Sequence, residues 1–284
     1  MNRKIKIARL SIISNTFLII IKLIVGLISC SVSIISEAIH SAMDLVAALI
    51  AFFSVRISDQ PADTEHPYGH GKFENVSGVI EAVLIFVAAI WIILESIKKL
   101  LHHTPIEALG LGSLVMLVSA LVNFMVSHRI YKVAKETDSI ALEADALHLK
   151  TDVYTSLGVG LGLLLIWITG KTFLDPIVAI IVALFILRES FILLKNAYSP
   201  LLDTALSNDE IEIIKNHLEE KKFRFHGLKT RKAGQFRFAE LHLEMPETLS
   251  LREVHDVCDE IENYLKGEIK NLDINIHVEP TESK

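Results

Sequence analysis

Long apolar runs fill the chain up to about Pro200, and short alternating segments follow. Six of the runs are long enough to cross a bilayer, which takes about 20 mostly apolar residues. They cover roughly 8–29, 33–55, 76–97, 108–130, 141–168 and 174–194. We therefore predict a membrane domain at 1–202, an all-α bundle of six transmembrane helices with both chain ends on one side of the membrane.

The remaining segment, 203–284, has the pattern of a small cytoplasmic domain. Ser207 and Glu210 have the spacing of a capping box, which predicts a helix to about Lys222. Strands are expected at 225–231, 237–245 and 272–279, where apolar and polar residues tend to alternate, and a second helix is expected at 250–266. The order αββαβ indicates an α+β, ferredoxin-like (metallochaperone-like) domain with both helices on one face of the sheet.

Lysine and arginine predict the orientation in the membrane. The N-terminal side of the spans carries Arg3, Lys4, Lys6, Arg9, Arg56, Lys72, Arg129, Lys132, Lys135, Arg188 and Lys195. The opposite side carries Lys98, Lys99 and Lys171. The positive-inside rule then places both termini in the cytoplasm. The first run is too long for a signal peptide, so we expect a multi-pass protein of the cell (inner) membrane.

Composition supports a membrane class and narrows the chemistry. Mean hydropathy is +0.44, and 51% of the residues are hydrophobic. The net charge of −6 comes from the part after Leu202, which contains 18 acidic and 12 basic residues. An acidic domain without a basic stripe argues against nucleic acid and favours cations. Cys30 and Cys258 are too few for a thiolate zinc site, so imidazole and carboxylate must supply the ligands.

Two HxxxD motifs stand inside apolar spans, His40 with Asp44 and His148 with Asp152. A spacing of four residues places both side chains of a motif on one helix face. If the two helices pack together, two imidazoles and two carboxylates meet, which is the ligand number and type of tetrahedral Zn²⁺. The alternative is one His–Asp hydrogen bond within each helix and no metal.

Further ionisable residues in the spans include Lys22, Glu37, Glu81 and Asp145. Each is costly in lipid and needs a partner or a water-filled path. Lys22 and Glu81 either pair with each other and hold two helices together, or contribute to the path. The pattern leaves both interpretations open.

Two more clusters contain residue types that can bind a metal ion. The loop between the second and third spans holds Asp63, His66 and His70 in a setting rich in proline and glycine, where the alternative is an ordinary polar loop. The soluble domain holds His226, His242, His255, His277 and Glu279. On the last strand His277 and Glu279 point the same way, which favours a metal site over scattered surface histidines.

These ligands imply a driving force for transport. Imidazole must be neutral to bind metal, so metal and protons compete for the site. A site that opens alternately to the two sides then exchanges a divalent metal ion for one or more protons.

At this point the chain resembles the cation diffusion facilitator family along essentially its whole length. The resemblance rests on segments 36–44 and 144–152, the stretch His66–Lys72 with Asp63, and the soluble-domain histidines with Glu279. It implies a dimeric, proton-coupled metal exporter. The transport site would be His40, Asp44, His148 and Asp152, and a binuclear site would lie in the soluble domain at the dimer interface.

The resemblance also implies that Lys72 pairs with Asp203 to interlock the protomers, the alternative being two solvated charges. His40 resembles the zinc-selective type, because some relatives place aspartate there. Glu279 stands where many relatives carry aspartate, so the soluble-domain site departs from the family pattern.

We therefore expect a homodimeric transporter with Zn²⁺ as cargo and allosteric ligand. The alternative within transport is the same fold exporting Fe²⁺, Mn²⁺, Co²⁺ or Cd²⁺, because ligand type ranks these ions without excluding them. An enzyme is not expected, since a membrane zinc hydrolase needs a water-activating carboxylate, as in HExxH, and the sequence has no such motif. A membrane-anchored sensor would leave its buried charged pairs without a use.

Overall fold

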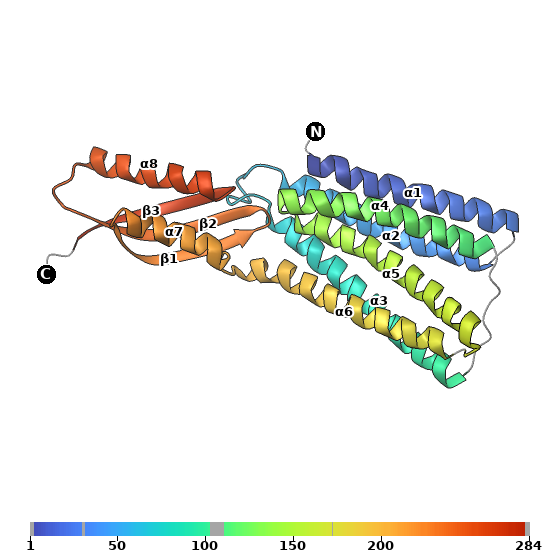
Figure 1. Ribbon diagram of the computed structural model, residues 1–284. Coiled ribbons are helices and arrows are strands. Elements are labelled where there is room, and N and C mark those ends of the chain that lie inside the picture. Colours follow the sequence, from blue (N-terminus) through green and yellow to red (C-terminus); the bar gives the residue numbers. More distant parts are fainter. Residues whose placement is uncertain (1–2, 30–31, 103–110, 172, 282–284) are drawn as a thin grey trace. The chain divides into compact units, whose positions relative to one another are not determined.

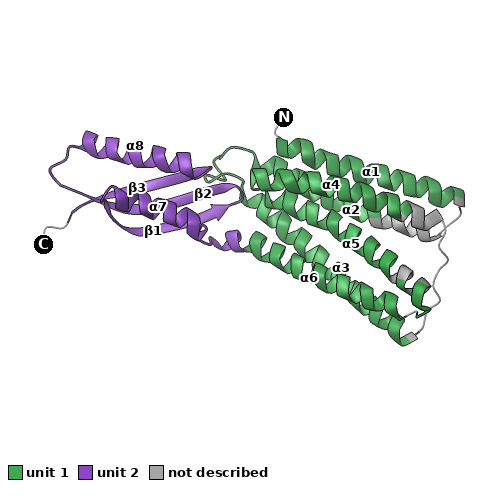
Figure 2. Ribbon diagram, viewed as in Figure 1, with its two compact units in different colours: residues 1–198 green, residues 199–284 purple. Residues whose placement is uncertain are grey.

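The computed structural model describes residues 3–29, 32–102, 111–171 and 173–281. It divides into two compact units, Met1–Tyr198 and Ser199–Lys284 (Figure 2). The first unit is helical, and the second combines helices with a small sheet (Figure 1).

Six helices form the first unit, as predicted. They are α1 (Arg3–Ser29), α2 (Val32–Ser58), α3 (Lys72–His102), α4 (Leu111–Thr137), α5 (Ile140–Thr169) and α6 (Leu174–Tyr198). Four of them, α1, α2, α3 and α6, contain described stretches long and apolar enough to cross a membrane. Large apolar side chains such as Trp91 and Phe191, 69% and 60% exposed, cover their outer surface. Such an outer surface suits a lipid environment.

A buried ion-pair network joins one end of the bundle. Lys4 Nζ at the start of α1 lies 2.7 Å from Glu74 Oε1 of α3 and 3.1 Å from Asp59 Oδ1, which follows α2. Ser58 donates to Glu74 Oε1 at 2.7 Å, and Ser139 before α5 donates to Glu74 Oε2. Lys4 and Glu74 are 2% and 0% exposed. Four helices are thus tied together by one carboxylate whose oxygens are both satisfied.

The second unit has the predicted order αββαβ after a short 3₁₀ turn, η1 (Ser199–Leu202). Its elements are α7 (Asn208–Glu220), β1 (Arg224–Ala233), β2 (Phe236–Met245), α8 (Leu251–Glu268) and β3 (Leu272–Pro280). The strands lie in the order β1-β2-β3, with β1 antiparallel and β3 parallel to β2. The predicted capping box of Ser207 and Glu210 starts α7, and Ser250 and Glu253 form a second one at α8.

The core of this unit lies on one face of the sheet. Apolar residues of β2 and β3 pack there against α7 and α8, through side chains such as Ile214, Leu218, Leu241, Ile261 and Leu265. Alternation along β2 sends His242 and its neighbours of the same parity to the other face. The helices therefore cover one side of the sheet, and the polar side is left for ligands.

Candidate metal sites

The first cluster lies inside the helical unit. Asp44 of α2 and His148 and Asp152 of α5 each offer a ligand atom, and these atoms lie within 4.8 Å of one another. His148 Nε2 is 3.2 Å from Asp44 Oδ1, although 104 residues separate the two in sequence. Asp44 is buried, and the other two are partly buried. The contact between α2 and α5 thus brings together two halves of the predicted ligand set, as the paired motifs require.

The fourth predicted ligand, His40, belongs to α2, one turn before Asp44. Its side chain lies outside the described residues. Its ligation of metal stays a prediction.

Two amides support the cluster and were not predicted from the sequence. Asn123 Nδ2 of α4 donates to Asp152 Oδ2 at 3.2 Å, and Asn15 Nδ2 of α1 donates to the backbone carbonyl of Asp44 at 3.4 Å. Ligating carboxylates are commonly held by such outer hydrogen bonds. The signal that would have found them is a lone asparagine within an apolar helix.

Lys22 and Glu81, for which the sequence left an ion pair open, have other partners in the structure. Lys22 Nζ donates to Ser41 Oγ at 2.8 Å, whereas Glu81 accepts from Ser77 at 3.3 Å. Among the described side chains, Lys22 and Glu81 therefore do not form the ion pair considered from the sequence. Asp145 accepts from Ser11 of α1 at 3.0 Å.

The second cluster is the loop between α2 and α3. Asp63 Oδ1 lies 3.4 Å from His66 Nδ1, and Asp63 Oδ2 lies 3.4 Å from His70 Nε2. The two imidazole rings are 4.4 Å apart. Gly69 allows this turn because its φ of +79° is in the left-handed region. The structure thus brings the three predicted loop residues together, and their ligation of metal stays a prediction.

The electrostatics of this loop suit a cation. The backbone amide of His66 donates to Asp63, and this hydrogen bond, followed by that from Glu65, holds the pKa of the carboxyl below its usual value. The Nδ1 atoms of both histidines are buried and form no hydrogen bond with any described group. The Nδ1 atom of His66 faces Asp63, so a metal ion in the cluster would satisfy it, whereas His70 faces Asp63 with its other nitrogen, Nε2.

The third cluster is a row of histidines across the sheet. The strand register pairs His226 of β1 with His242 of β2, and His242 with His277 of β3. Neighbouring rings along the row are 5.0 Å apart. The residues lie on the face opposite the core, so their imidazoles are accessible to a ligand.

Glu279 completes this third cluster. Its Oε1 lies 2.7 Å from His242 Nδ1, and its Oε2 lies 3.3 Å from His226 Nε2. The three residues have ligand atoms within 4.8 Å of one another. Gly227 lies beside them, and its φ of +64° is in the left-handed region that favours glycine. A glutamate in place of the usual aspartate thus still reaches the imidazoles.

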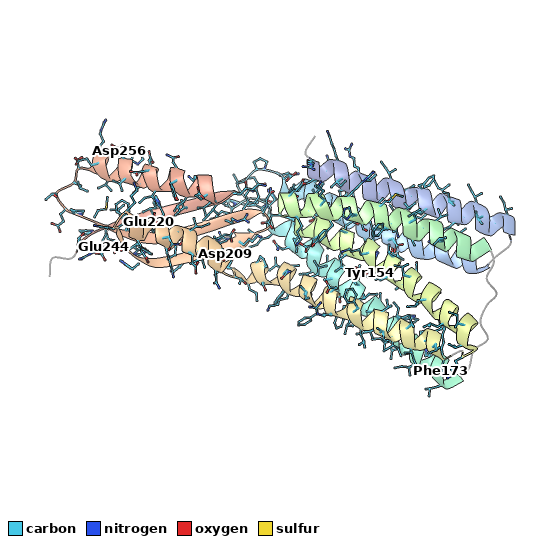
Figure 3. The ribbon with its side chains drawn as sticks, in the orientation of Figure 1. Tyr154, Phe173, Asp209, Glu220, Glu244 and Asp256 are labelled. Atoms are coloured by element: carbon cyan, nitrogen blue, oxygen red, sulfur yellow. The ribbon has the colours of Figure 1, made fainter. Side chains whose placement is uncertain are left out.

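The sequence reasoning missed Glu244 and grouped His255 with the others. Glu244 of β2, labelled in Figure 3, lies opposite Glu279 in register, and its Oε1 is 3.8 Å from His226 Nδ1. His255 lies on α8 and pairs with Asp259 at 3.6 Å. The structure does not bring His255 into the cluster of a single chain, so its role as a ligand stays a prediction.

The predicted interlock joins residues of different units. Lys72 begins α3 in the first unit, and Asp203 follows η1 in the second. Within its own unit Asp203 Oδ1 lies 3.5 Å from Arg231 Nη1. Asp203 is therefore already part of a local ion pair, and its pairing with Lys72 stays a prediction.

Comparison with known proteins covers nearly the whole chain. The family model for the cation efflux transmembrane domain matches residues 8–202, and that for the cation efflux protein cytoplasmic domain matches 206–281. The transporter sll1263 of Synechocystis is 35% identical over 90% of this chain and 83% of its own length. The cation-efflux pump FieF of Yersinia enterocolitica is 34% identical over 98% and 94%. Protein p34 of Rickettsia rickettsii is 31% identical over 98% and 93%.

Proposed function

Since this chain belongs to the cation efflux family, also called the cation diffusion facilitators, and is therefore a membrane-embedded metal efflux transporter, we propose that it exports Zn²⁺ in exchange for protons. Its relatives include proteins named cation-efflux pumps. The export direction is out of the cytoplasm, with both termini cytoplasmic and the bundle in the inner membrane.

The observation that carries this proposal is the cluster of Asp44, His148 and Asp152 inside the bundle. Carboxylate and imidazole donors from two helices lie within 4.8 Å of one another. Nitrogen and oxygen donors in small number suit Zn²⁺, whereas Mg²⁺ prefers six oxygens and water. His40 would supply the fourth ligand and close a tetrahedral site.

Proton exchange follows from the same donors. The contact between His148 Nε2 and Asp44 Oδ1, 3.2 Å, is a hydrogen bond that a metal ion must replace. The proton in this contact leaves when the metal binds both atoms, because a ligating imidazole nitrogen carries no proton. When the site faces the outside, returning protons release the metal.

The two other clusters fit a regulatory use of the same ion. Asp63, His66 and His70 would hold one ion at the loop, and His226, His242, His277 and Glu279 would hold metal in the soluble domain, with His255 as a further ligand. We take the active form to be a homodimer whose soluble domains metal draws together, and whose protomers Lys72 and Asp203 interlock. We put the domain boundary at 202/203, which is supported by the end of the first matched family segment at residue 202 and lies a few residues after the division between the compact units at 198/199.

Transport in proteoliposomes tests the proposal. The protein is reconstituted, a pH gradient is imposed, and uptake of Zn²⁺, Cd²⁺, Mn²⁺, Co²⁺ and Fe²⁺ is measured for the wild type and for Asp152→Ala. We expect saturable, gradient-driven Zn²⁺ uptake that Asp152→Ala abolishes. The matched control is Glu189→Ala, which removes a carboxylate of α6 that pairs with Arg188 at 2.7 Å. Equal Zn²⁺ uptake by wild type and Asp152→Ala would show that the cluster is not the transport site.

A further inference from the structure

Two buried acidic side chains of the bundle, Glu81 and Asp145, belong neither to the three metal clusters nor to the Lys4 network. Glu81 of α3 is 0% exposed, and Asp145 of α5 is 1% exposed. Burial of a carboxylate without a compensating partner costs several kcal/mol, so both residues require an explanation.

Each of these carboxyl groups is only half satisfied. Ser77 donates to Glu81 Oε1 at 3.3 Å, and Ser11 donates to Asp145 Oδ1 at 3.0 Å. Glu81 Oε2 and Asp145 Oδ2 are buried and have no hydrogen-bond partner among the described groups. One open oxygen on each of two fully buried carboxyls points to a ligand that both can bind.

The two groups act on each other and on the metal cluster. α3 and α5 pack together at these positions, since Ala82 and Ala144, next to Glu81 and Asp145 in sequence, belong to one buried apolar cluster. The charges of Asp145 and His148 therefore act on Glu81. α2 contributes Asp44 next to His148, and α1 contributes Ser11, which bonds Asp145.

The remaining packed elements add little compensating charge. α6 packs on α3 and α5 with the apolar Ile186 and Leu193, and Ser190 is also buried there. α4 offers the amide of Asn123 to Asp152. Lys22 of α1 donates to Ser41 instead. Around the two carboxyls, His148 is therefore the described group that carries a compensating positive charge when protonated.

We propose that Glu81 and Asp145 form a proton-binding pair that takes up a proton exchanged for the metal ion. This inference rests on the proton exchange proposed above, and it adds carriers that are not metal ligands. A proton needs one carboxylate oxygen, and the carboxylate becomes a neutral carboxylic acid. A transition-metal ion needs about four donor atoms, and the pair offers two free oxygens and no imidazole.

Electrostatics links this pair to the cargo. A divalent cation at His148 places positive charge near Glu81, which favours release of the shared proton. Departure of the cation leaves negative groups close together in a low-dielectric interior, which favours proton uptake. Because coupling between two binding events is reciprocal, a proton on the pair also weakens metal binding at the cluster. Both directions suit an exchanger.

The test measures the number of coupled protons. Proteoliposomes are loaded at a series of pH gradients with the membrane voltage clamped at zero, and the accumulation ratio of Zn²⁺ is recorded at steady state. Each coupled proton changes the ratio about tenfold per pH unit. For Glu81→Gln we expect the slope of log accumulation against the pH gradient to fall by about one proton, and Asp145→Asn should do the same.

Two variants serve as controls. Glu81→Asp keeps a carboxyl and should keep the wild-type slope, and so should Glu189→Gln, whose carboxylate pairs with Arg188. Unchanged slopes in both Glu81→Gln and Asp145→Asn overturn the proposal while leaving proton exchange intact. A wild-type slope of zero instead overturns the proton exchange itself, and this inference with it.

A binding measurement covers the case in which a variant does not transport. Zn²⁺ is titrated into the full-length protein in detergent, and the protons released per bound ion are counted in two buffers of different ionisation enthalpy. Glu81→Gln should bind the same number of Zn²⁺ ions and release fewer protons. Equal proton release, or loss of a bound Zn²⁺ ion, would show that the pair has another role, in the second case as metal ligands.

Discussion

Replacing Asn123 by alanine tests whether the bundle orients its metal ligands through outer hydrogen bonds. Asn123 Nδ2 donates to Asp152 Oδ2 at 3.2 Å, and it comes from α4, whereas the predicted ligands come from α2 and α5. Alanine removes this donor and leaves the ligands themselves unchanged. Asp152 then loses a contact that fixes one of its oxygens.

The size of the effect follows from known metal sites. Loss of a hydrogen bond to a ligating group typically costs about 10- to 100-fold in metal affinity, or about 1.4–2.8 kcal/mol. We expect the Zn²⁺ concentration for half-maximal uptake in proteoliposomes to rise by a factor in this range, with the maximal rate less affected. Isothermal titration of the detergent-solubilised protein gives the same factor as a ratio of dissociation constants.

A neighbouring variant provides the control. Ser127→Ala also removes a buried polar group of α4, but Ser127 Oγ donates to the Phe124 carbonyl of its own helix at 3.1 Å. It should leave the half-maximal concentration unchanged. If Asn123→Ala shifts Zn²⁺ affinity no more than Ser127→Ala does, then Asp152 is either not a ligand or is oriented by other contacts.

Three further predictions concern stability and regulation. Glu74→Gln removes the carboxylate that lies 2.7 Å from the buried Lys4, while Asp59 remains 3.1 Å away. It should destabilise the bundle by about 1.5–3 kcal/mol, the contribution of a hydrogen bond to a charged group, seen as a lower melting temperature in detergent, whereas a change at the exposed Glu65 should not. Burial, and then the charge of Lys221, lowers the pKa of His217 below its usual 6.5. The neutral imidazole therefore contributes its full share to the free energy of unfolding above pH 6.5, and this share falls at lower pH as His217 becomes protonated in the unfolded chain. His217→Phe should reduce the fall in melting temperature between about pH 7.5 and 5.5, measured in thermal scans. His242→Ala should raise the Zn²⁺ concentration needed for flux while gradient-driven uptake at saturating metal persists, and an unchanged concentration dependence would refute a regulatory site in the soluble domain.

The elements of this protein were largely predictable because two periodicities encode them. Apolar runs gave the six helices, and alternation gave β2 and β3 nearly to their ends. Boundaries differed where polar residues extend a helix beyond its apolar stretch. The third run was expected at 76–97, whereas α3 spans Lys72–His102, because helical hydrogen bonds continue through Lys72, Glu74 and Lys99 whether or not lipid surrounds them.

The metal clusters were predictable to the extent that their ligands are close in sequence. Asp63, His66 and His70 lie within eight residues of one loop, and His148 and Asp152 lie on one face of α5. His255 was grouped with the other soluble-domain histidines by composition alone. Its position on α8 follows from chain topology, which a list of residue types does not contain.

Contacts between distant elements were the part that the sequence concealed. In the sequence Lys4 is one of several basic residues before the first apolar run, yet it is 2% exposed and pairs with two carboxylates. Nothing in its local pattern separates it from the exposed Arg3, which pairs with Glu136 at 64% side-chain exposure. The difference arises only when α1, α2 and α3 converge, because burial is a property of the packed bundle.

The buried carboxyls of the bundle differ in what satisfies their oxygens. In a bilayer every ionisable group off the transport path adds cost without function, so a bundle should retain only those that bind cargo, bind counter-ions or hold helices together. Glu74 holds helices, since both its oxygens are bonded within the Lys4 network. Asp44 and Asp152 converge on His148. Asp145 accepts one hydrogen bond from Ser11 of α1, and Glu81 accepts one from Ser77 of its own helix. Each carboxyl nevertheless keeps a buried oxygen without a partner among the described groups, and binding of the exchanged proton is the role that this arrangement supports.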